Sequence, residues 1–362
     1  MKSFSAVFLF VATVSFFITG CVRETFVSSA DQHIQYEGRI KTTARNVVFF
    51  WPGSSAKIVV KGRGKVFAVL KDENGKNYYD VILDRDSIRV LHPDTLKQRY
   101  LLASFDGGTH SVQLFKRTEW DKGYTLFYGF VLQGNLQVIN LLQKKHLKLE
   151  FYGNSITAGY AVDDDPSHSH PDSIFTNNYD SYAAITARYF HADYRCICKS
   201  GIGILISWFP LTMPQLYNRL NPVDSLSRWD FKKYTPDVVV INLLQNDSWL
   251  VNRPSFPEFK KKFGTRPPSP ETIIQAYKNF VLKIRKAYPR AKIICMLGNM
   301  DITRKGSPWP GYVKKAVQQM HDKKVYTLFV PYKNTPGHPG RHEQQVLADS
   351  LIGKIKRINA FR

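Results

Sequence analysis

The stretch LEFYGNSITAGY, Leu149 to Tyr160, changes character after Tyr152, where a mostly apolar, strand-like run gives way to Gly-Asn-Ser and then to small residues. Such a break is typical of a buried strand that ends in a tight turn before a helix. Ser155 therefore stands between a predicted strand and a predicted helix start. What this serine does depends on the other side chains that the fold brings near it.

From about residue 146 onward, short apolar runs alternate with amphipathic helical patterns, one of which follows Ser269 as a predicted cap and Pro270 as first helical residue. This alternation predicts a parallel sheet covered by helices on both faces. In such sheets the active site lies at the carboxyl ends of the strands. The five predicted strands are Leu147–Tyr152, Tyr194–Lys199, Asp237–Leu243, Ala291–Leu297 and Val325–Val330.

The preceding part of the chain, from about residue 31 to residue 143, has short segments rich in Val, Phe and Tyr, separated by turns and without a helical period. Asn74-Gly75, between KVFAVLKDE and KNYYDVILD, is a strong hairpin signal. The pattern predicts a β-sandwich of jelly-roll type. The predicted domains are thus a jelly-roll-like β-sandwich over residues 21–145 and an α/β domain over residues 146–362.

Residues 1–21, MKSFSAVFLFVATVSFFITGC, combine one lysine, an apolar run from Ala6 to Ile18 and small residues before Cys21. The run is too short for a membrane span and predicts a signal peptide over residues 1–20. Ile-Thr-Gly-Cys resembles the lipobox of bacterial lipoproteins, which implies lipid attachment to Cys21; plain secretion is the alternative. We expect a lipid anchor in the bacterial cell envelope, on either face of the outer membrane.

The formal net charge is +22, from 51 Lys+Arg and 29 Asp+Glu, and it favours acidic partners such as nucleic acid, an anionic membrane or an acidic polysaccharide. Because no basic recognition helix, zinc-finger spacing or RNP-like motif occurs, no nucleic-acid partner is expected. Cys196, Cys198 and Cys295 lack a histidine or fourth thiol at ligand spacing, which disfavours zinc. A bridge between residues two apart would be strained, so buried free thiols are expected.

Candidate catalytic groups follow the predicted strands at one edge of the sheet. The first strand is followed by Ser155, the second by Gly201 and the third by Asn246, and His338 lies in the Pro/Gly-rich loop after the fifth. Ester hydrolysis needs a hydroxyl nucleophile, a neutral imidazole to take its proton, and donors for the oxyanion. Each residue alone is more often a cap, turn or surface residue. Their order after successive strands favours a hydrolase.

FYGNSIT, SGIG, LLQND and HPGRH resemble the four blocks of the SGNH, or GDSL-type, hydrolases. With the β-sandwich and its FFWPGSS stretch, the chain resembles carbohydrate esterase family two, the acetyl xylan esterase-like enzymes that act on plant polysaccharides. The resemblance implies a three-layer α/β/α domain with a five-stranded parallel sheet, and ester hydrolysis without a cofactor. It also implies Ser155 as the nucleophile, His338 as base and acid, and an oxyanion hole of the Ser155 and Gly201 N–H groups and the Asn246 side chain.

The chain departs from the family's pattern at three positions. Asn154 replaces the aspartate of Gly-Asp-Ser, Leu244 replaces the first glycine of Gly-x-Asn-Asp, and Thr335 replaces the aspartate of Asp-x-x-His. The triad acid is therefore absent. Some family members work as a Ser–His dyad in which a backbone carbonyl orients the imidazole, and we expect this arrangement here. His342 competes with His338 as the base, but only His338 precedes a proline, as the family's base does.

Three other features bear on ligands. The run DDDPSHSHPD, residues 163–172, carries metal-ligating side chains, but such a polar run is usually a solvated loop, and no metal is expected. Trp249 and Trp309 follow the third and fourth predicted strands. Each can stack on a sugar or anchor its loop in the core. Both are predicted substrate contacts, Trp249 in particular because it lies two residues after Asp247.

The sequence thus predicts a monomeric lipoprotein that removes acetyl groups from an acetylated polysaccharide or oligosaccharide through an acyl-enzyme. Two alternatives stay open: a weakly active or inactive glycan-binding lipoprotein, and a lipase or thioesterase for longer acyl chains. Turnover of p-nitrophenyl acetate tests the first alternative. A comparison of acetate with octanoate esters tests the second.

Overall fold

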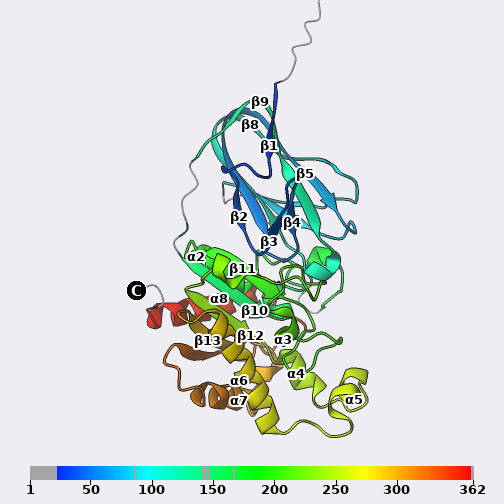
Figure 1. Ribbon diagram of the computed structural model, residues 1–362, viewed down its shortest axis with the longest axis vertical. Coiled ribbons are helices and arrows are strands. Elements are labelled where there is room, and N and C mark those ends of the chain that lie inside the picture. The colour runs from blue at the N-terminus through cyan, green and yellow to red at the C-terminus, as the bar shows by residue number, and fades with distance from the viewer. Residues whose placement is uncertain (1–22, 85–86, 141–144, 146, 166–167, 360–362) are drawn as a thin grey trace, which may run out of the picture.

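The computed structural model describes residues 23–359 except 85–86, 141–144, 146 and 166–167. The predicted signal peptide and Cys21 lie outside the described residues. Two sheets organise the chain, an antiparallel sheet in the N-terminal part and a parallel sheet in the C-terminal part (Figure 1). None of the helices in the described part of the chain combines the length and the apolar character needed to cross a membrane.

The antiparallel sheet has nine strands, with the order β3-β4-β9-β5-β8-β6-β7, while β1 pairs with β9 and β2 with β5. β5 runs without interruption through Lys61-Gly62-Arg63-Gly64-Lys65, with a register shift between Lys61 and Arg63 in its pairing with β8. The strands are β1 (Glu24–Ser28), β2 (Gln35–Glu37), β3 (Ile40–Thr42), β4 (Val47–Phe49), β5 (Ser55–Asp72), β6 (Tyr79–Leu83), β7 (Ser87–Leu91), β8 (Gln98–Lys116) and β9 (Thr125–Val138).

The hairpin predicted at Asn74-Gly75 is wrong, because β5 and β6 do not pair with each other. β8 lies between them and is hydrogen-bonded to both. The turn itself forms, since the Asp72 carboxylate accepts the N–H of Gly75 at 2.8 Å. Local hydrogen bonds therefore form the turn, but β5 and β6 do not pair across it, because β8 pairs with both of them.

The parallel sheet has five strands in the order β11-β10-β12-β13-β14, and every neighbouring pair is parallel. All five strands predicted from the apolar runs are confirmed to within about two residues, the usual uncertainty of strand ends. They are β10 (Lys148–Gly153), β11 (Asp193–Cys198), β12 (Val238–Asn242), β13 (Lys292–Leu297) and β14 (Val325–Phe329).

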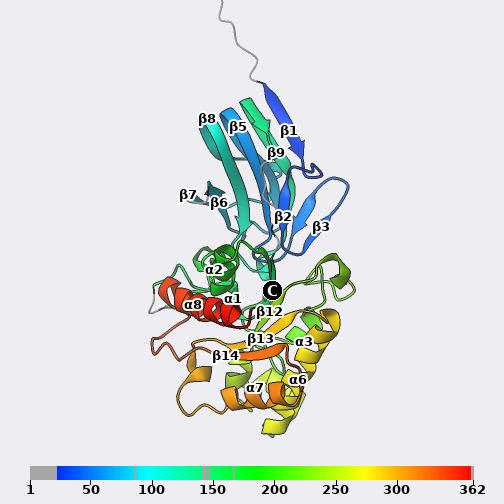
Figure 2. The same ribbon diagram turned by 90° about the vertical axis from the view of Figure 1, so that its left-hand side faces the viewer.

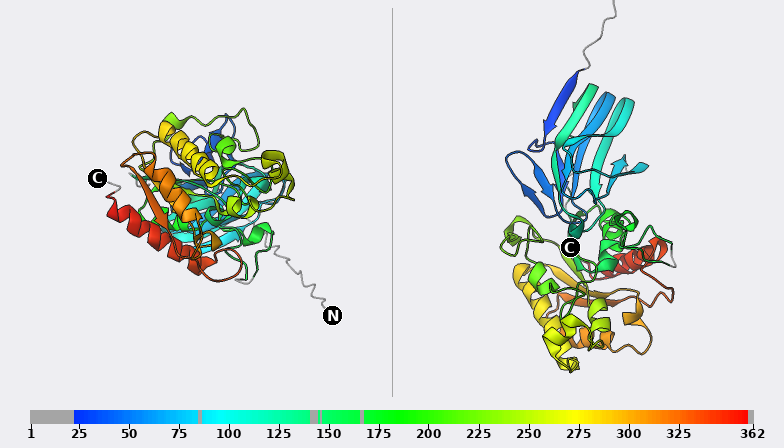
Figure 3. Two further views of the ribbon diagram at one scale, coloured as in Figure 1. Left: turned by 90° about the horizontal axis from the view of Figure 1, so that it is seen from below. Right: turned by 90° about the vertical axis from the view of Figure 1, so that its right-hand side faces the viewer.

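Helices cover both faces of this sheet, as predicted. In β12, Val239 and Ile241 pack in the cluster that includes α6 and α7, whereas Val238 and Val240 pack in the cluster that includes α2 and α8. Figures 2 and 3 show α6 and α8 on opposite sides of the sheet. The helices are α1 (Ser155–Ala158), α2 (Tyr182–Tyr189), α3 (Met213–Leu216), α4 (Gln245–Leu250), α5 (Pro257–Phe263), α6 (Pro270–Ala287), α7 (Trp309–Gln318) and α8 (Arg341–Arg357).

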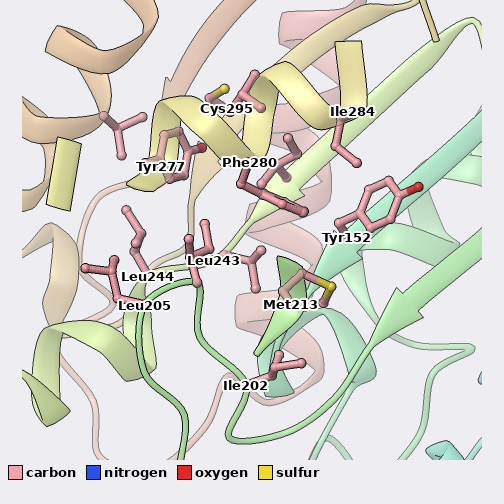
Figure 4. Packing of buried hydrophobic residues seen from close by; sticks show 14 of the residues in the cluster. Tyr152, Ile202, Leu205, Met213, Leu243, Leu244, Tyr277, Phe280, Ile284 and Cys295 are labelled. Atoms are coloured by element: carbon pink, nitrogen blue, oxygen red, sulfur yellow. The ribbon is translucent and has the colours of Figure 1, made fainter. Parts of the chain in front are cut away.

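The longest helix, α6, begins as the sequence predicts. The Ser269 hydroxyl accepts the N–H of Thr272 at 3.2 Å, and Pro270 is the first helical residue. Tyr277 and Phe280 on this helix pack in one cluster with Leu244, which lies just before α4 (Figure 4). The core thus extends from α6 to the segment that begins α4.

Buried polar contacts join the two domains. Arg39, from the segment between β2 and β3, is 1% exposed, and its guanidinium lies 2.8 Å from the Glu150 carboxylate on β10. The Trp51 indole N–H donates to the carbonyl of Leu220 at 2.8 Å. The antiparallel domain lies on the side of the parallel sheet formed by β11 (Figure 1). The domain boundary therefore has side-chain contacts in addition to the linker between β9 and β10.

Candidate active site

Ser155 lies where β10 ends and α1 begins. Gly153 closes the strand, and no larger residue fits there because a Cβ would lie 1.9 Å from Thr157 Oγ1. Asn154 caps the helix by accepting the N–H of Ile156 at 3.1 Å. As the first residue of a helix, Ser155 has a backbone N–H without an intrahelical acceptor, and this group can bind an anion. The break in the sequence therefore positions both the hydroxyl and the N–H of Ser155.

The structure brings His338 to Ser155 across 183 residues of sequence, with Nε2 3.0 Å from the Ser155 Oγ. This distance suits proton transfer from the hydroxyl to a neutral imidazole. His342, the competing candidate, is exposed on α8. Of the two histidines, only His338 is therefore placed to act as the base for Ser155.

A serine hydroxyl, and not the predicted backbone carbonyl, faces the other ring nitrogen of His338. Ser169 Oγ lies 3.0 Å from Nδ1 and accepts the His338 backbone N–H at 3.1 Å. When Nδ1 carries the proton and donates it to Ser169, Nε2 is free to accept the proton of Ser155. The Thr335 hydroxyl instead donates to Glu343 at 2.9 Å. The expectation of a carbonyl partner is corrected because the Ser169 hydroxyl occupies the hydrogen-bonding position at Nδ1.

Sequence reasoning missed Ser169. It lies in the Asp/His-rich run that was interpreted as a solvated loop, and nothing in its spacing connects it with His338. Within the part of the chain that the structure describes, no group of three or more His, Cys, Asp or Glu side chains is arranged to hold a metal ion. What this run contributes at the imidazole is the Ser169 hydroxyl.

The surroundings of His338 favour its neutral form. Burial, followed by the positive charge of Lys333, lowers its pKa from 6.5 to about 4. The Tyr160 ring packs against the imidazole, with 4.8 Å between ring centroids. Because only the neutral imidazole can accept the Ser155 proton, a lowered pKa keeps the base available in mildly acidic solution.

We therefore expect kcat/KM for an acetyl ester to stay level from pH 8 to about pH 5, and to fall only as the pH passes through the His338 pKa of about 4. The loss occurs on the acid side because protonation removes the base. Lys333→Met should move this loss of activity to higher pH, since it removes a positive charge that disfavours the imidazolium form of His338. A wild-type midpoint near 6.5, the ordinary histidine value, would contradict this prediction.

The loop after β11, the strand that pairs with β10, carries Gly201 at the same edge of the sheet as Ser155. Gly201 has a φ of +81°, which favours glycine. The buried carboxylate of Asp247 organises the next residues by accepting the N–H groups of Ile204, Leu205 and Ile206 at 2.6–3.1 Å. The aspartate of the Asn-Asp pair thus has a structural role beneath the loop. It shapes the segment that follows the predicted oxyanion donor.

Asn246 lies in the first turn of α4, and its amide orientation is determined by two partners. Its Oδ1 accepts the Trp208 indole N–H at 3.1 Å, and its Nδ2 donates to the carbonyl of Ile202 at 2.8 Å. An amide nitrogen carries two hydrogens, so one N–H is left for a ligand. This N–H, together with those of Ser155 and Gly201, can bind an oxyanion.

Asn246→Ala should lower kcat about a hundredfold or more and change KM little, because the lost donor acts mainly on the transition-state oxyanion. The control is Gln245→Ala, which removes a neighbouring buried amide that donates to Asp301 at 2.7 Å. Initial rates on one acetyl ester measure both variants. An unchanged kcat in Asn246→Ala would remove this side chain from the oxyanion hole.

The fold accommodates two of the departures from the family's pattern. Asn154 accepts the helix-capping N–H with its side-chain oxygen, as an aspartate would. Leu244, in place of glycine, has a φ of +76°, a backbone conformation that is strained for a leucine. Its side chain is fully buried, so apolar packing offsets part of that strain. Neither replacement removes an oxyanion donor.

The two tryptophans predicted to contact substrate have different surroundings. Trp309 is 7% exposed at the start of α7 and packs in the core, which argues against stacking on a sugar. Trp249 is half-buried on α4, and its indole N–H donates to Asp301 at 2.9 Å. A third tryptophan, Trp208, was missed although it follows Gly201 by seven residues. It is 39% exposed and is hydrogen-bonded to Asn246, so it presents an aromatic surface beside the oxyanion donors.

Comparisons with known proteins show which family this chain resembles. A family model described as carbohydrate esterase 2 N-terminal matches residues 36–141. The solved structure of a family two carbohydrate esterase from Clostridium thermocellum, in complex with cellohexaose, is 30% identical, with a TM-score of 0.78. The match covers 91% of this chain and 100% of that one. The similarity therefore extends over both domains.

Two curated relatives are also similar. The acetylxylan esterase / glucomannan deacetylase of Cellvibrio japonicus is 26% identical, over 97% of this chain and 98% of that protein. The cellulase/esterase CelE of Acetivibrio thermocellus is 30% identical over 84% of this chain. The match spans only 37% of CelE's own length. The names of both of these relatives include an esterase activity.

Proposed function

Because this chain belongs to carbohydrate esterase family two, we propose that it removes O-acetyl groups from an acetylated polysaccharide or oligosaccharide through an acyl-enzyme on Ser155. The observation that carries the proposal is the 3.0 Å approach of His338 Nε2 to Ser155 Oγ at the edge where Gly201 and Asn246 also lie. The relatives' names, which state acetylxylan and glucomannan substrates, support a carbohydrate ester as the substrate class.

The first half of the reaction acylates Ser155. His338 Nε2 takes the hydroxyl proton while Oγ attacks the acetyl carbonyl carbon, and the carbonyl oxygen becomes an oxyanion. The N–H groups of Ser155 and Gly201 and the free N–H of Asn246 stabilise that charge. His338 then returns the proton to the departing sugar oxygen as the carbon–oxygen bond breaks. The products are the deacetylated sugar hydroxyl and an acetyl ester on Ser155.

The second half repeats the proton transfers with water. His338 accepts a proton from a water molecule while the water oxygen attacks the carbonyl carbon of acetyl-Ser155. The N–H groups of Ser155, Gly201 and Asn246 stabilise the second oxyanion as they did the first. Collapse releases acetate and restores the Ser155 hydroxyl with the proton that His338 held. In each half of the reaction the His338 imidazole becomes positively charged. The Ser169 hydroxyl accepts the hydrogen bond from the Nδ1–H of His338 but carries no negative charge to balance the imidazolium.

Acetate release from acetylated xylan, mannan and pectin, measured beside p-nitrophenyl acetate and octanoate, tests the proposal. We expect turnover of p-nitrophenyl acetate, acetate release from at least one glycan, and little turnover of octanoate. An inert protein that still binds glycans would favour the glycan-binding alternative. Preference for octanoate would favour a lipase or thioesterase.

We further propose that the protein is anchored to the bacterial outer membrane through a lipid on Cys21. The described chain begins at residue 23, at the end of the antiparallel domain that points away from the parallel sheet (Figure 1). An anchor at that end would hold the active site away from the membrane surface. A polymeric substrate could then reach the active site. The small residues before Cys21 support this proposal.

Cys21→Ser should release the protein from the membrane fraction, because it removes the thiol that would carry the lipid. Fractionation at high salt provides the measurement, since salt screens the attraction between the protein's formal net charge of +22 and anionic lipids. The matched control is Cys295→Ser, which changes a buried free thiol in the parallel sheet and should leave the membrane association unchanged. Firm association of Cys21→Ser at high salt would contradict the anchor.

A further inference from the structure

Two charged residues of the antiparallel domain, Arg117 and Glu119, reach across to the loops that surround Ser155. They follow directly after β8 and are only 3% and 2% exposed. Charged side chains are rarely buried this deeply unless they are paired and hydrogen-bonded. The groups that pair with Arg117 and Glu119 therefore indicate what these two buried side chains do.

Glu119 holds the loop that carries Gly201. Its carboxylate accepts the Ser200 N–H at 2.6 Å, and the Ser200 hydroxyl donates to its other oxygen. The Lys199 ammonium lies 3.5 Å from the same carboxylate. Ser200 and Gly201 share a peptide bond, so a carboxylate that fixes Ser200 also determines where the Gly201 N–H points.

Arg117 holds the loop that carries Ser169. Its guanidinium donates to the carbonyls of Ile174 at 3.1 Å and Thr176 at 3.3 Å, and it pairs with the Asp163 carboxylate. In the sequence, Ser169 lies between Asp163 and Ile174. One buried guanidinium thus connects the two ends of the segment that places a hydroxyl against His338.

We propose that Glu119 and Arg117 are positioning residues for the hydrolysis proposed above, on which this inference rests. Glu119 aligns the Gly201 N–H with the oxyanion, and Arg117 keeps Ser169 against His338. Neither side chain touches the reacting atoms. The antiparallel domain is therefore part of the catalytic apparatus, because it fixes both loops from outside the parallel-sheet domain.

The backbone of the oxyanion loop explains why such a contact is needed. Glycine at a φ of +81° has access to many other conformations, so Gly201 does not fix its own N–H. Catalytic donors lose much of their effect when they are displaced by about 1 Å. Asp247 organises the residues after Gly203, whereas Glu119 organises the residue before Gly201. The two carboxylates hold the loop from both sides.

Glu119→Ala and Glu119→Gln test the first half of the proposal. The matched control is Glu37→Ala, because Glu37 is also a buried carboxylate of the antiparallel domain. Glu37 pairs with Lys145, which donates to the carbonyl of Ala192 at 3.2 Å, just before the start of β11. The control thus removes the same chemical group at the same domain boundary, at the opposite end of β11.

We expect Glu119→Ala to lower kcat for p-nitrophenyl acetate about tenfold or more with KM changed less than about twofold, since alignment acts on the transition state. Glu119→Gln should recover most of the loss, because its amide oxygen still accepts the Ser200 N–H. Glu37→Ala should lower the thermal unfolding temperature and leave kcat near wild type. Unfolding curves show that each variant is folded.

Arg117→Lys and Ser169→Ala test the second half in a double-mutant cycle. Lysine keeps the charge but cannot reach both carbonyls and the carboxylate. Because both variants loosen the same imidazole, their losses in kcat should be non-additive. Strictly additive losses would show that Arg117 does not act through Ser169.

The outcomes separate this inference from the proposed function. An inert wild type on p-nitrophenyl acetate contradicts the proposed function and the positioning role together. With an active wild type, three results contradict the role of Glu119 alone. They are an unchanged kcat in folded Glu119→Ala, a raised KM with unchanged kcat, and an equal loss of kcat in Glu37→Ala.

Discussion

Ser155→Ala is expected to abolish ester hydrolysis, with a loss of kcat of about a thousandfold or more, while the protein stays folded. The variant removes the nucleophile and only one small polar group from the start of α1. The Asn154 cap and the backbone N–H of residue 155 are unaffected by the substitution, so we expect the start of α1 to keep its structure. Hydrolysis of p-nitrophenyl acetate and thermal unfolding provide the two measurements.

Ser248→Ala is the matched control for that experiment. Ser248 lies on α4 at the same edge of the sheet, and its hydroxyl donates to the carbonyl of Gln245 at 2.7 Å. It should retain nearly all activity. If Ser155→Ala keeps more than a few per cent of wild-type activity with unchanged unfolding, another nucleophile is in use.

His338→Ala is expected to remove nearly all activity, whereas Thr335→Ala should cost less than about tenfold in kcat/KM, or less than about 1.4 kcal/mol. A carboxylate at the position of Thr335 would stabilise the imidazolium, and removing such a group from a triad costs about ten-thousandfold. The Thr335 hydroxyl is instead 2.9 Å from Glu343, so its loss leaves the imidazole untouched. The comparison uses one acetyl ester for both variants.

Ser169→Ala completes this comparison, because the Ser169 hydroxyl is the group at Nδ1. It should cost more than Thr335→Ala and less than His338→Ala, since a hydroxyl fixes the tautomer without neutralising the imidazolium. An equal collapse of the His338 and Thr335 variants would show that Thr335 orients the base after all. Full activity of His338→Ala would make His342 the next candidate.

The fold of the C-terminal half could be predicted because its signals are local. Each strand is a short apolar run, each helix has its own periodicity, and Ser269-Pro270 begins α6 as expected. The parallel arrangement follows from the alternation of strands and helices. It places Ser155, Gly201, Asn246 and the loop of His338 at the carboxyl ends of strands.

The antiparallel half was less predictable. Some of its strands could be predicted, but their partners could not, because a turn such as Asn74-Gly75 does not determine which strand completes the ladder. β8 lies between the strands that flank this turn. Long-range pairing of this kind depends on which apolar faces are buried together in the whole domain.

By itself, the sequence predicted which residues carry the proposed chemistry, from their order after successive strands and from the resemblance of their sequence blocks to those of the SGNH hydrolases. The tertiary structure alone decided what surrounds them. It placed Ser169 at His338 across 169 residues and Glu119 at Ser200 across 81 residues, and it buried Trp309 in the core. These contacts join side chains on separate elements. No local spacing encodes them, because they exist only when the two sheets and their loops are packed together.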